Sequence, residues 1–246
     1  MIKKILIITG LCLLAGYIVF AVCFFERKPK EMICSNFSIE SMDSITMRFV
    51  NVAEIQKYID KRNLNPYGKQ VKEINTDAIE QVILENRIIS QAEAFITDKG
   101  DVRVKIKAKE PILRIMSDDG ADYYIDRDST TMPLSPHFTA YLPIATGSIK
   151  PKFARTELYK FALFLRDNEF WNAQIEQIEV LPGNEIVLVP RVGDQKIVLG
   201  KLAGYEEKLG RLLTFYQKGL NKIGWNNYAV INLKYDKQVV CSKEKM

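Results

Sequence analysis

The sequence has one histidine, His137, and four cysteines scattered along 246 residues. Metal sites usually draw several His, Cys or carboxylate ligands from closely spaced motifs, and no such spacing occurs in this sequence. It also lacks the patterns typical of a serine nucleophile elbow, a phosphate-binding loop or a zinc peptidase. The sequence therefore predicts a protein without catalytic residues, metal, cofactor or small-molecule substrate.

The body of the chain also lacks a surplus of basic charge. The formal net charge of +5 comes mostly from residues 1–30, which hold five basic residues and one acidic residue, whereas the remainder has 30 basic and 29 acidic residues. A nucleic-acid-binding domain needs its excess of lysine and arginine on its own surface. Nucleic acid is therefore not a predicted partner.

A long uncharged run stands near the N-terminus. From Ile5 to Phe25 there are 21 residues without a charge, and a helix of that length would extend about 32 Å, enough to cross a hydrocarbon layer of about 30 Å. A cleaved signal peptide normally has a shorter apolar region and ends at small residues, and Ala21-Val22-Cys23 is a poor cleavage site. Val22 also disfavours lipoprotein processing at Cys23. The run predicts an uncleaved, single transmembrane helix.

Charge does not fix the orientation of this helix. Two lysines and the α-amino group precede the run, and three basic residues follow it by position 30, so the positive-inside rule gives a tie. Long domains can cross a membrane despite their charges. We expect residues 31–246 to lie outside the cytoplasm.

The cysteines do not form a compact framework. Cys12 and Cys23 lie within the uncharged run, while Cys34 and Cys241 lie far apart in the body. The last two could pair in an oxidising compartment, or they could stay as free thiols. The second alternative is favoured, because no closely spaced cysteine pattern accompanies them.

The first part of the body predicts a small α+β domain. A strand is expected at 33–39, followed by two amphipathic helices with Asn51 and Thr76 as their N-caps. Two strands follow, at 92–97 and 102–109, in which apolar and polar residues alternate as expected for strands with one buried face. The predicted order is β-α-α-β-β.

Basic residues alternate with apolar ones along the last of these strands. Ile106 is expected to face the core, whereas the basic stripe could meet an acidic partner or lipid headgroups. The favoured interpretation is a solvated strand face that discourages edge pairing, because lysine commonly guards edge strands. The stripe consists of Arg103, Lys105, Lys107 and Lys109.

The rest of the chain predicts a strand-rich domain with two amphipathic helices, around 158–165 and 209–220. Runs of strands with occasional helices favour an α+β fold with an antiparallel sheet. The predicted strands include 175–180, 185–190, 196–199 and 229–240. The predicted domains are residues 1–30 (cytoplasmic tail, transmembrane helix and basic flank), 31–110 (the β-α-α-β-β domain), 111–241 (β domain) and 242–246 (frayed tail).

Two carboxylate pairs deserve comparison with an active site. Asp118-Asp119 and the pair Asp126 and Asp128 stand beside glycine or serine at expected hairpin ends, so turn formation is the favoured role. A membrane-anchored envelope enzyme is the alternative, and a deep pocket around Asp126, Asp128 or His137 would support it.

Four short motifs follow one another behind the uncharged run. They are Val104–Ile112 (VKIKAKEPI), Tyr123–Asp126 (YYID), Leu142–Gly147 (LPIATG) and Asn232–Tyr235 (NLKY). In their order and spacing these motifs resemble the FtsQ/DivIB family of bacterial cell-division proteins, over essentially the whole chain. Ser129 stands where that family usually has glycine, and Asn232 and Lys234 replace an aspartate and an arginine.

The resemblance implies a function. Members of the family sit in the bacterial inner membrane with the body in the periplasm, are enriched at the septum, and bind the small bitopic proteins FtsB and FtsL without being enzymes. Their POTRA domain is associated with recruitment, and their last strands with FtsB. This resemblance implies partner contacts at Leu233, Lys234, Tyr235, Gln238, Val239 and Val240. A POTRA-type envelope assembly or secretion factor is the alternative class, and core packing is the alternative role for Tyr235.

Overall fold

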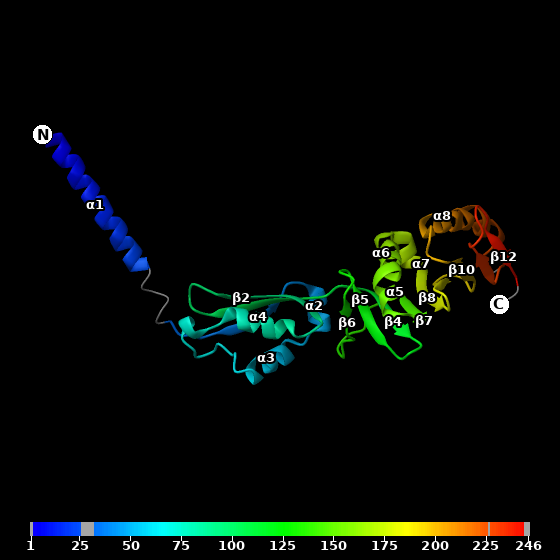
Figure 1. The fold of residues 1–246 in the computed structure, drawn as a ribbon, viewed down its shortest axis with the longest axis horizontal. Coiled ribbons are helices and arrows are strands. Elements are labelled where there is room, and N and C mark those ends of the chain that lie inside the picture. Colours follow the sequence, from blue (N-terminus) through cyan, green and yellow to red (C-terminus); the bar gives the residue numbers. More distant parts are fainter. Residues whose placement is uncertain (1, 26–31, 226, 244–246) are drawn as a thin grey trace. The chain divides into compact units, whose positions relative to one another are not determined.

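The structure, a computed structural model, describes residues 2–25, 32–225 and 227–243. The chain divides into two units, Met1–Ala108 and Lys109–Met246, and Figure 1 labels most of their helices and strands. Helix α1 spans Ile2–Phe25. Among the described residues, no helix has both the length and the apolarity needed to cross a membrane. The predicted basic flank at 26–30 and the end of the predicted tail lie outside the described residues.

The first unit contains a three-stranded sheet in the order β1-β3-β2. Strand β1 runs parallel to β3, and β2 runs antiparallel to β3. Its elements are β1 (Phe37–Ser41), α2 (Ser44–Phe49), α3 (Val52–Lys61), the short 3₁₀ helix η1 (Val71–Glu73), α4 (Thr76–Leu84), β2 (Ile89–Ile96) and β3 (Val102–Ala108).

Polar side chains start the helices of this unit. Asn51 caps α3 by accepting a hydrogen bond from the backbone of the second helical residue, as the sequence predicts. The predicted cap at Thr76 is wrong by one residue, because Asn75 accepts the bond from the N–H of Ala78, at 2.9 Å. Helix α2 is not predicted from the sequence, and its cap is Asp43.

The alternation along β3 is confirmed. Val102, Val104 and Ile106 are each 0% exposed, and the residues between them are exposed. The solvated face is confirmed for Arg103, Lys105 and Lys107, but the edge-guarding role is wrong, because β3 is the central strand of its sheet. Lys109 lies beyond β3 and belongs to the second unit, where its ammonium group pairs with Asp126.

The predicted strand at 33–39 is also shifted. Strand β1 begins only at Phe37, and Ile33 makes an isolated bridge to Gln70. Cys34 exchanges backbone hydrogen bonds with the 68–69 segment instead of with the sheet, donating to the carbonyl of Lys69 at 2.9 Å. Residues 33 and 34 therefore pair with the 68–70 segment, and the sheet strand starts after them.

The second unit contains a nine-stranded sheet in the order β12-β11-β10-β9-β8-β7-β4-β5-β6. Helices α5, η2, α6 and α7 follow β7 as a nearly continuous helical segment, and α8, η3 and α9 follow β10. The elements are β4 (Pro111–Ser117), β5 (Asp122–Asp126), β6 (Thr131–Met132), β7 (Ile144–Gly147), α5 (Pro151–Phe153), η2 (Ala154–Leu158), α6 (Tyr159–Asp167), α7 (Glu169–Gln174), β8 (Ile175–Leu181), β9 (Glu185–Pro190), β10 (Lys196–Gly200), α8 (Tyr205–Phe215), η3 (Tyr216–Leu220), α9 (Asn221–Ile223), β11 (Val230–Asn232) and β12 (Val240–Ser242).

The predicted antiparallel sheet is wrong in part. Five neighbouring pairs are antiparallel, but β4 and β7, β7 and β8, and β10 and β11 are parallel. Parallel neighbours need a crossover that returns the chain to the same end of the sheet. The helical segments after β7 and β10 provide two such crossovers.

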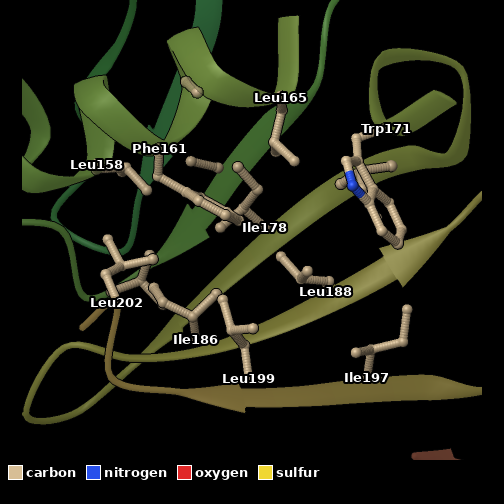
Figure 2. Close-up of a cluster of buried hydrophobic side chains, with 14 of the residues drawn as sticks. Leu158, Phe161, Leu165, Trp171, Ile178, Ile186, Leu188, Ile197, Leu199 and Leu202 are labelled. Carbon is tan, nitrogen blue, oxygen red and sulfur yellow. The ribbon is translucent and has the colours of Figure 1, made fainter. Parts of the chain in front are cut away.

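Helices and sheet share one apolar core. Figure 2 shows Leu158, Phe161 and Leu165 of the helical layer pointing toward side chains of the strands. Tyr205 at the start of α8 packs edge-on against Phe161, with ring centres 5.1 Å apart. The two helical segments therefore cover the same face of the sheet. The strand residues labelled in Figure 2 are Ile178, Ile186, Leu188, Ile197 and Leu199.

A glycine at the end of β7 permits the close pairing of two parallel strands. Gly147 has φ +102°, and a Cβ built on it would lie 2.3 Å from the carbonyl oxygen of Val180 on β8. Only glycine adopts this backbone conformation without strain. The last residue of the LPIATG motif therefore has a steric role at the β7–β8 junction.

Candidate partner-binding site

The end of the described chain forms a hairpin. The predicted single strand at 229–240 is wrong, because β11 ends at Asn232 and β12 begins only at Val240. The alternation of residues 230–236 is present in the sequence, but the chain turns between Tyr235 and Gln238, whose N–H donates to the carbonyl of Tyr235 at 3.5 Å. Lys237 in this turn has φ +58°.

Strand β12 lies at one edge of the nine-stranded sheet. It pairs with β11, and no described strand pairs with its other side. Strand β6, at the opposite edge, has two residues and is followed at once by Pro133, which cannot donate a hydrogen bond to an added strand. Of the two edges, β12 is therefore the better place for a partner strand.

The residues predicted to bind a partner differ in how far they are exposed to solvent. Leu233 is 0% exposed and belongs to the core, so it presents no surface. Tyr235 is 56% exposed, which makes the core alternative for its side chain wrong. Val239 is half-buried against the core, and Gln238 and Val240 are exposed. The surface of the hairpin thus keeps five of the six predicted residues.

Lys234 is exposed but already has an acidic partner. Its ammonium nitrogen lies 3.0 Å and 3.1 Å from the two carboxylate oxygens of Glu185 at the start of β9. Both side chains are more than one third exposed, so solvent screens the pair. A partner carboxylate would therefore have to share Lys234 with Glu185 or displace Glu185 from it.

Helix α8 holds the turn of the hairpin in place. Arg211 donates from Nη2 to the carbonyls of Leu233 (3.2 Å) and Tyr235 (3.3 Å), and its Nη1 lies 2.9 Å from Oε1 of Glu207. These carbonyls belong to the segment that carries the exposed tyrosine. Arg211 therefore fixes the turn in the free protein, which would lower the ordering cost if a partner bound there.

A groove of about 440 Å³ lies between α8–η3 and the hairpin. Phe215 and Val239 give it an apolar part, and three basic residues line it. An acidic and partly apolar segment would match this lining. The sequence alone did not indicate this groove, because its sides come from segments that meet only in the fold. It is lined by Arg211, Thr214, Phe215, Lys218, Gly219, Lys237 and Val239.

The thiol in β12 is half-buried. Cys241 is paired in register with Ile231, and burial raises the pKa of its thiol. A raised pKa keeps the thiol protonated and weakly nucleophilic at neutral pH. Cys34 and Cys241 are both free thiols, and the described residues contain no group of three metal-ligating side chains.

Asp126 has the turn role that the sequence favours. Its side chain is buried and accepts hydrogen bonds from the backbone N–H groups of Asp128 (3.0 Å) and Thr130 (2.7 Å), and the ammonium group of Lys109 lies 3.4 Å away. Ser129 in this turn has φ +58°, which explains why glycine suits the position. His137 is exposed in the loop after β6.

The order and pairing of the first unit define a POTRA-like domain, placed before a strand-rich domain with helices on one face. Residues 32–107 match the family model described as a POTRA-like domain. Residues 110–242 match the one described as FtsQ/DivIB, C-terminal related. The second match covers more than half of the chain.

The chain belongs to the FtsQ/DivIB family, and the predicted resemblance is confirmed. The family assigns the protein to bacterial cell division and to protein–protein contacts within the division machinery. Proteins of this family are membrane-associated and typically non-catalytic. No curated protein matches the chain.

Proposed function

We propose that this protein is a non-catalytic divisome component that binds small bitopic proteins of the FtsB/FtsL type. Residues 5–25 anchor it once in the inner membrane, and residues 31–246 lie in the periplasm and gather at the septum. There it links assembly of the division ring to septal peptidoglycan synthesis. The open edge of β12, braced by Arg211, is the observation that carries the proposal.

Binding uses the backbone of β12 first. An extended partner segment adds to the edge through main-chain hydrogen bonds, and side chains beside the edge select its sequence. Tyr235 and Val240 supply exposed apolar area next to that edge, and their exposed fractions are 56% and 43%. The anchor keeps both proteins at one membrane, so weak contacts act at high effective concentration.

Truncating Tyr235 tests the contact site. Tyr235→Ala is expected to weaken binding of a soluble FtsB-like ectodomain about tenfold, equal to about 1.4 kcal/mol, because tyrosine is a common interface anchor. The melting temperature should hardly change, since this side chain lies outside the core. Titration by calorimetry and thermal melting of the full chain in detergent measure both quantities.

Tyr141→Ala is the matched control. Tyr141 is 83% exposed on the loop before β7, away from β12 along the sheet, so its loss should leave affinity unchanged. In cells depleted of the native protein, the Tyr235 variant should restore division less well than the Tyr141 variant, giving filaments. Wild-type affinity in a folded Tyr235→Ala protein would remove this residue from the site.

The anchor is tested separately. The 21 uncharged residues from Ile5 to Phe25 are expected to stay attached and to carry the body across the membrane. Alkaline phosphatase fused after Met246 should be active, because it needs the oxidising periplasm, and a cytoplasmic reporter at the same place should be silent. The opposite pattern, or a mature N-terminus near residue 24, would exclude this topology.

A further inference from the structure

One end of the first unit is built from three segments of the chain. The N–H of Val71 donates to the carbonyl of Met32 at 2.9 Å, and the N–H of Gly68 donates to the carbonyl of Cys34 at 2.8 Å. The turn between β2 and β3 lies against the same residues, because a Cβ built on Gly100 would come within 3.3 Å of the side chains of Met32 and Val71. The three segments therefore stand together at the end of the sheet where β3 begins.

This end exposes two large apolar side chains. Tyr67 is 67% exposed and Ile33 is 58% exposed. The backbone that carries the tyrosine is held in place, because its N–H donates to Oδ1 of Asn65 at 3.0 Å and the next residue, Gly68, is bonded to Cys34. Within the described part of the chain the Tyr67 hydroxyl makes no hydrogen bond. A fixed turn thus presents an aromatic ring with a polar tip, next to an aliphatic side chain.

The charges at this end balance. The three segments carry three basic and three acidic side chains, so neither a strongly acidic nor a strongly basic partner is favoured. A surface that suits an amphipathic ring and an aliphatic side chain together is the boundary between water and a bilayer, where tyrosine is enriched. The charged residues are Lys69, Lys72, Glu73, Asp98, Lys99 and Asp101.

The sequence keeps this end close to the proposed anchor. Seven residues, 26–32, separate Phe25 at the end of the uncharged run from Ile33. A fully extended chain advances at most about 3.6 Å per residue, so Ile33 lies within about 29 Å of the end of the run. Two side chains on so short a tether meet the bilayer at a high effective concentration, which makes even a weak contact sufficient.

We propose that Tyr67 and Ile33 insert into the headgroup region of the bilayer that holds the N-terminal run. The inference rests on the anchor of the proposed function and adds a contact with lipid. The Tyr67 ring lies at the boundary with the acyl chains and its hydroxyl group faces the headgroups, and Ile33 adds apolar area beside it. This contact limits the directions in which the first unit can present its other faces to partners.

The test uses the full chain in phosphatidylcholine nanodiscs that hold one chain each. A nitroxide on the lipid acyl chain near the headgroup broadens the NMR signals of nearby methyl groups. The δ1-methyl signal of Ile33 should lose most of its intensity, whereas that of Ile45 should hardly change. Ile45 is also exposed, but it lies in α2 at the other end of β3, where the N–H of Ala108 donates to the hydroxyl of Thr46 at 2.8 Å.

Tyr67→Asp should restore most of the Ile33 intensity, because a carboxylate resists entry into the bilayer interface. The melting temperature should stay the same, since the side chain is exposed. Met47→Asp is the matched control, because Met47 is an exposed apolar residue of α2, and it should leave the Ile33 signal broadened. Equal broadening of Ile33 in the native chain and in Tyr67→Asp would mean that the tether alone brings it near lipid, and would overturn the proposal.

Ile18, within the uncharged run, distinguishes this contact from the anchor itself. A nitroxide at the bilayer centre should broaden its methyl signal. A sharp Ile18 signal would refute the anchor of the proposed function and this inference with it. A broadened Ile18 signal together with a sharp Ile33 signal would overturn this inference alone. Broadening of Ile33 only in discs that hold two chains would identify a second copy of this chain as the occupant and would also overturn it.

Discussion

Gly147→Ala is expected to lower the stability of the second unit by about 3 kcal/mol or more. Two costs add at this position. Alanine is strained at φ +102°, and its Cβ would lie 2.3 Å from the carbonyl oxygen of Val180. That oxygen accepts a hydrogen bond from the N–H of Ser148 at 3.0 Å, so it cannot retreat without loss. Guanidinium unfolding of the second unit measures the change.

Gly120→Ala separates the two costs. Gly120 has a similar φ of +87° in the hairpin between β4 and β5, but an added Cβ would meet nothing within 4 Å. Gly120→Ala should therefore lower stability only through the strain of alanine at positive φ, by about 1 kcal/mol. Equal losses for both variants would show that the approach of β7 to β8 is not limited by Gly147.

Ile106→Asp should lower the stability of the first unit about as much as Gly147→Ala lowers that of the second. The side chain is 0% exposed on β3, the central strand of the sheet, so aspartate would bury a charge without a partner or leave the unit unfolded. The expected loss is about 3 kcal/mol or more. Thermal melting, followed by circular dichroism, reports it.

The neighbouring residue provides the comparison. Lys105 points to the opposite, exposed face of β3, with its ammonium group 5.6 Å from the ring centre of Phe95. Lys105→Gln should change stability by about 0.5 kcal/mol or less, because an exposed cation–π contact contributes little. Similar melting shifts for the two variants would mean that the faces of β3 are assigned wrongly.

Local patterns predict the parts of the fold that depend on local physics. The period of two in β3 arises from burial of one face, so it is visible in the sequence and is confirmed. Helix α3 is equally visible, because its cap and its apolar side lie within ten residues. Sheet order is different, since nothing in residues 196–232 tells that β10 will take β11 as a parallel neighbour.

The candidate site shows the same limit. The sequence places Tyr235 in a single strand at 229–240, whereas the structure exposes it beside a turn that contains Lys237 at φ +58° instead of a glycine. The alternation therefore read as one long strand. The NLKY motif places Leu233 among the predicted contacts, yet its side chain packs in the core. No local pattern indicates Arg211, because its contacts with the turn join residues more than twenty positions apart.

The position of β12 at an edge also has a mechanical consequence. Hydrogen bonds between strands run across the strand direction, so a force applied parallel to an added partner strand loads all of those bonds together. A force applied perpendicular to the strands would break them one after another, starting at one end. The Arg211 brace ties the adjoining turn to α8 and opposes that peeling. A strand–strand interface of this kind would resist the force of a constricting cell wall best when that force acts parallel to β12, as shear between partner and protein.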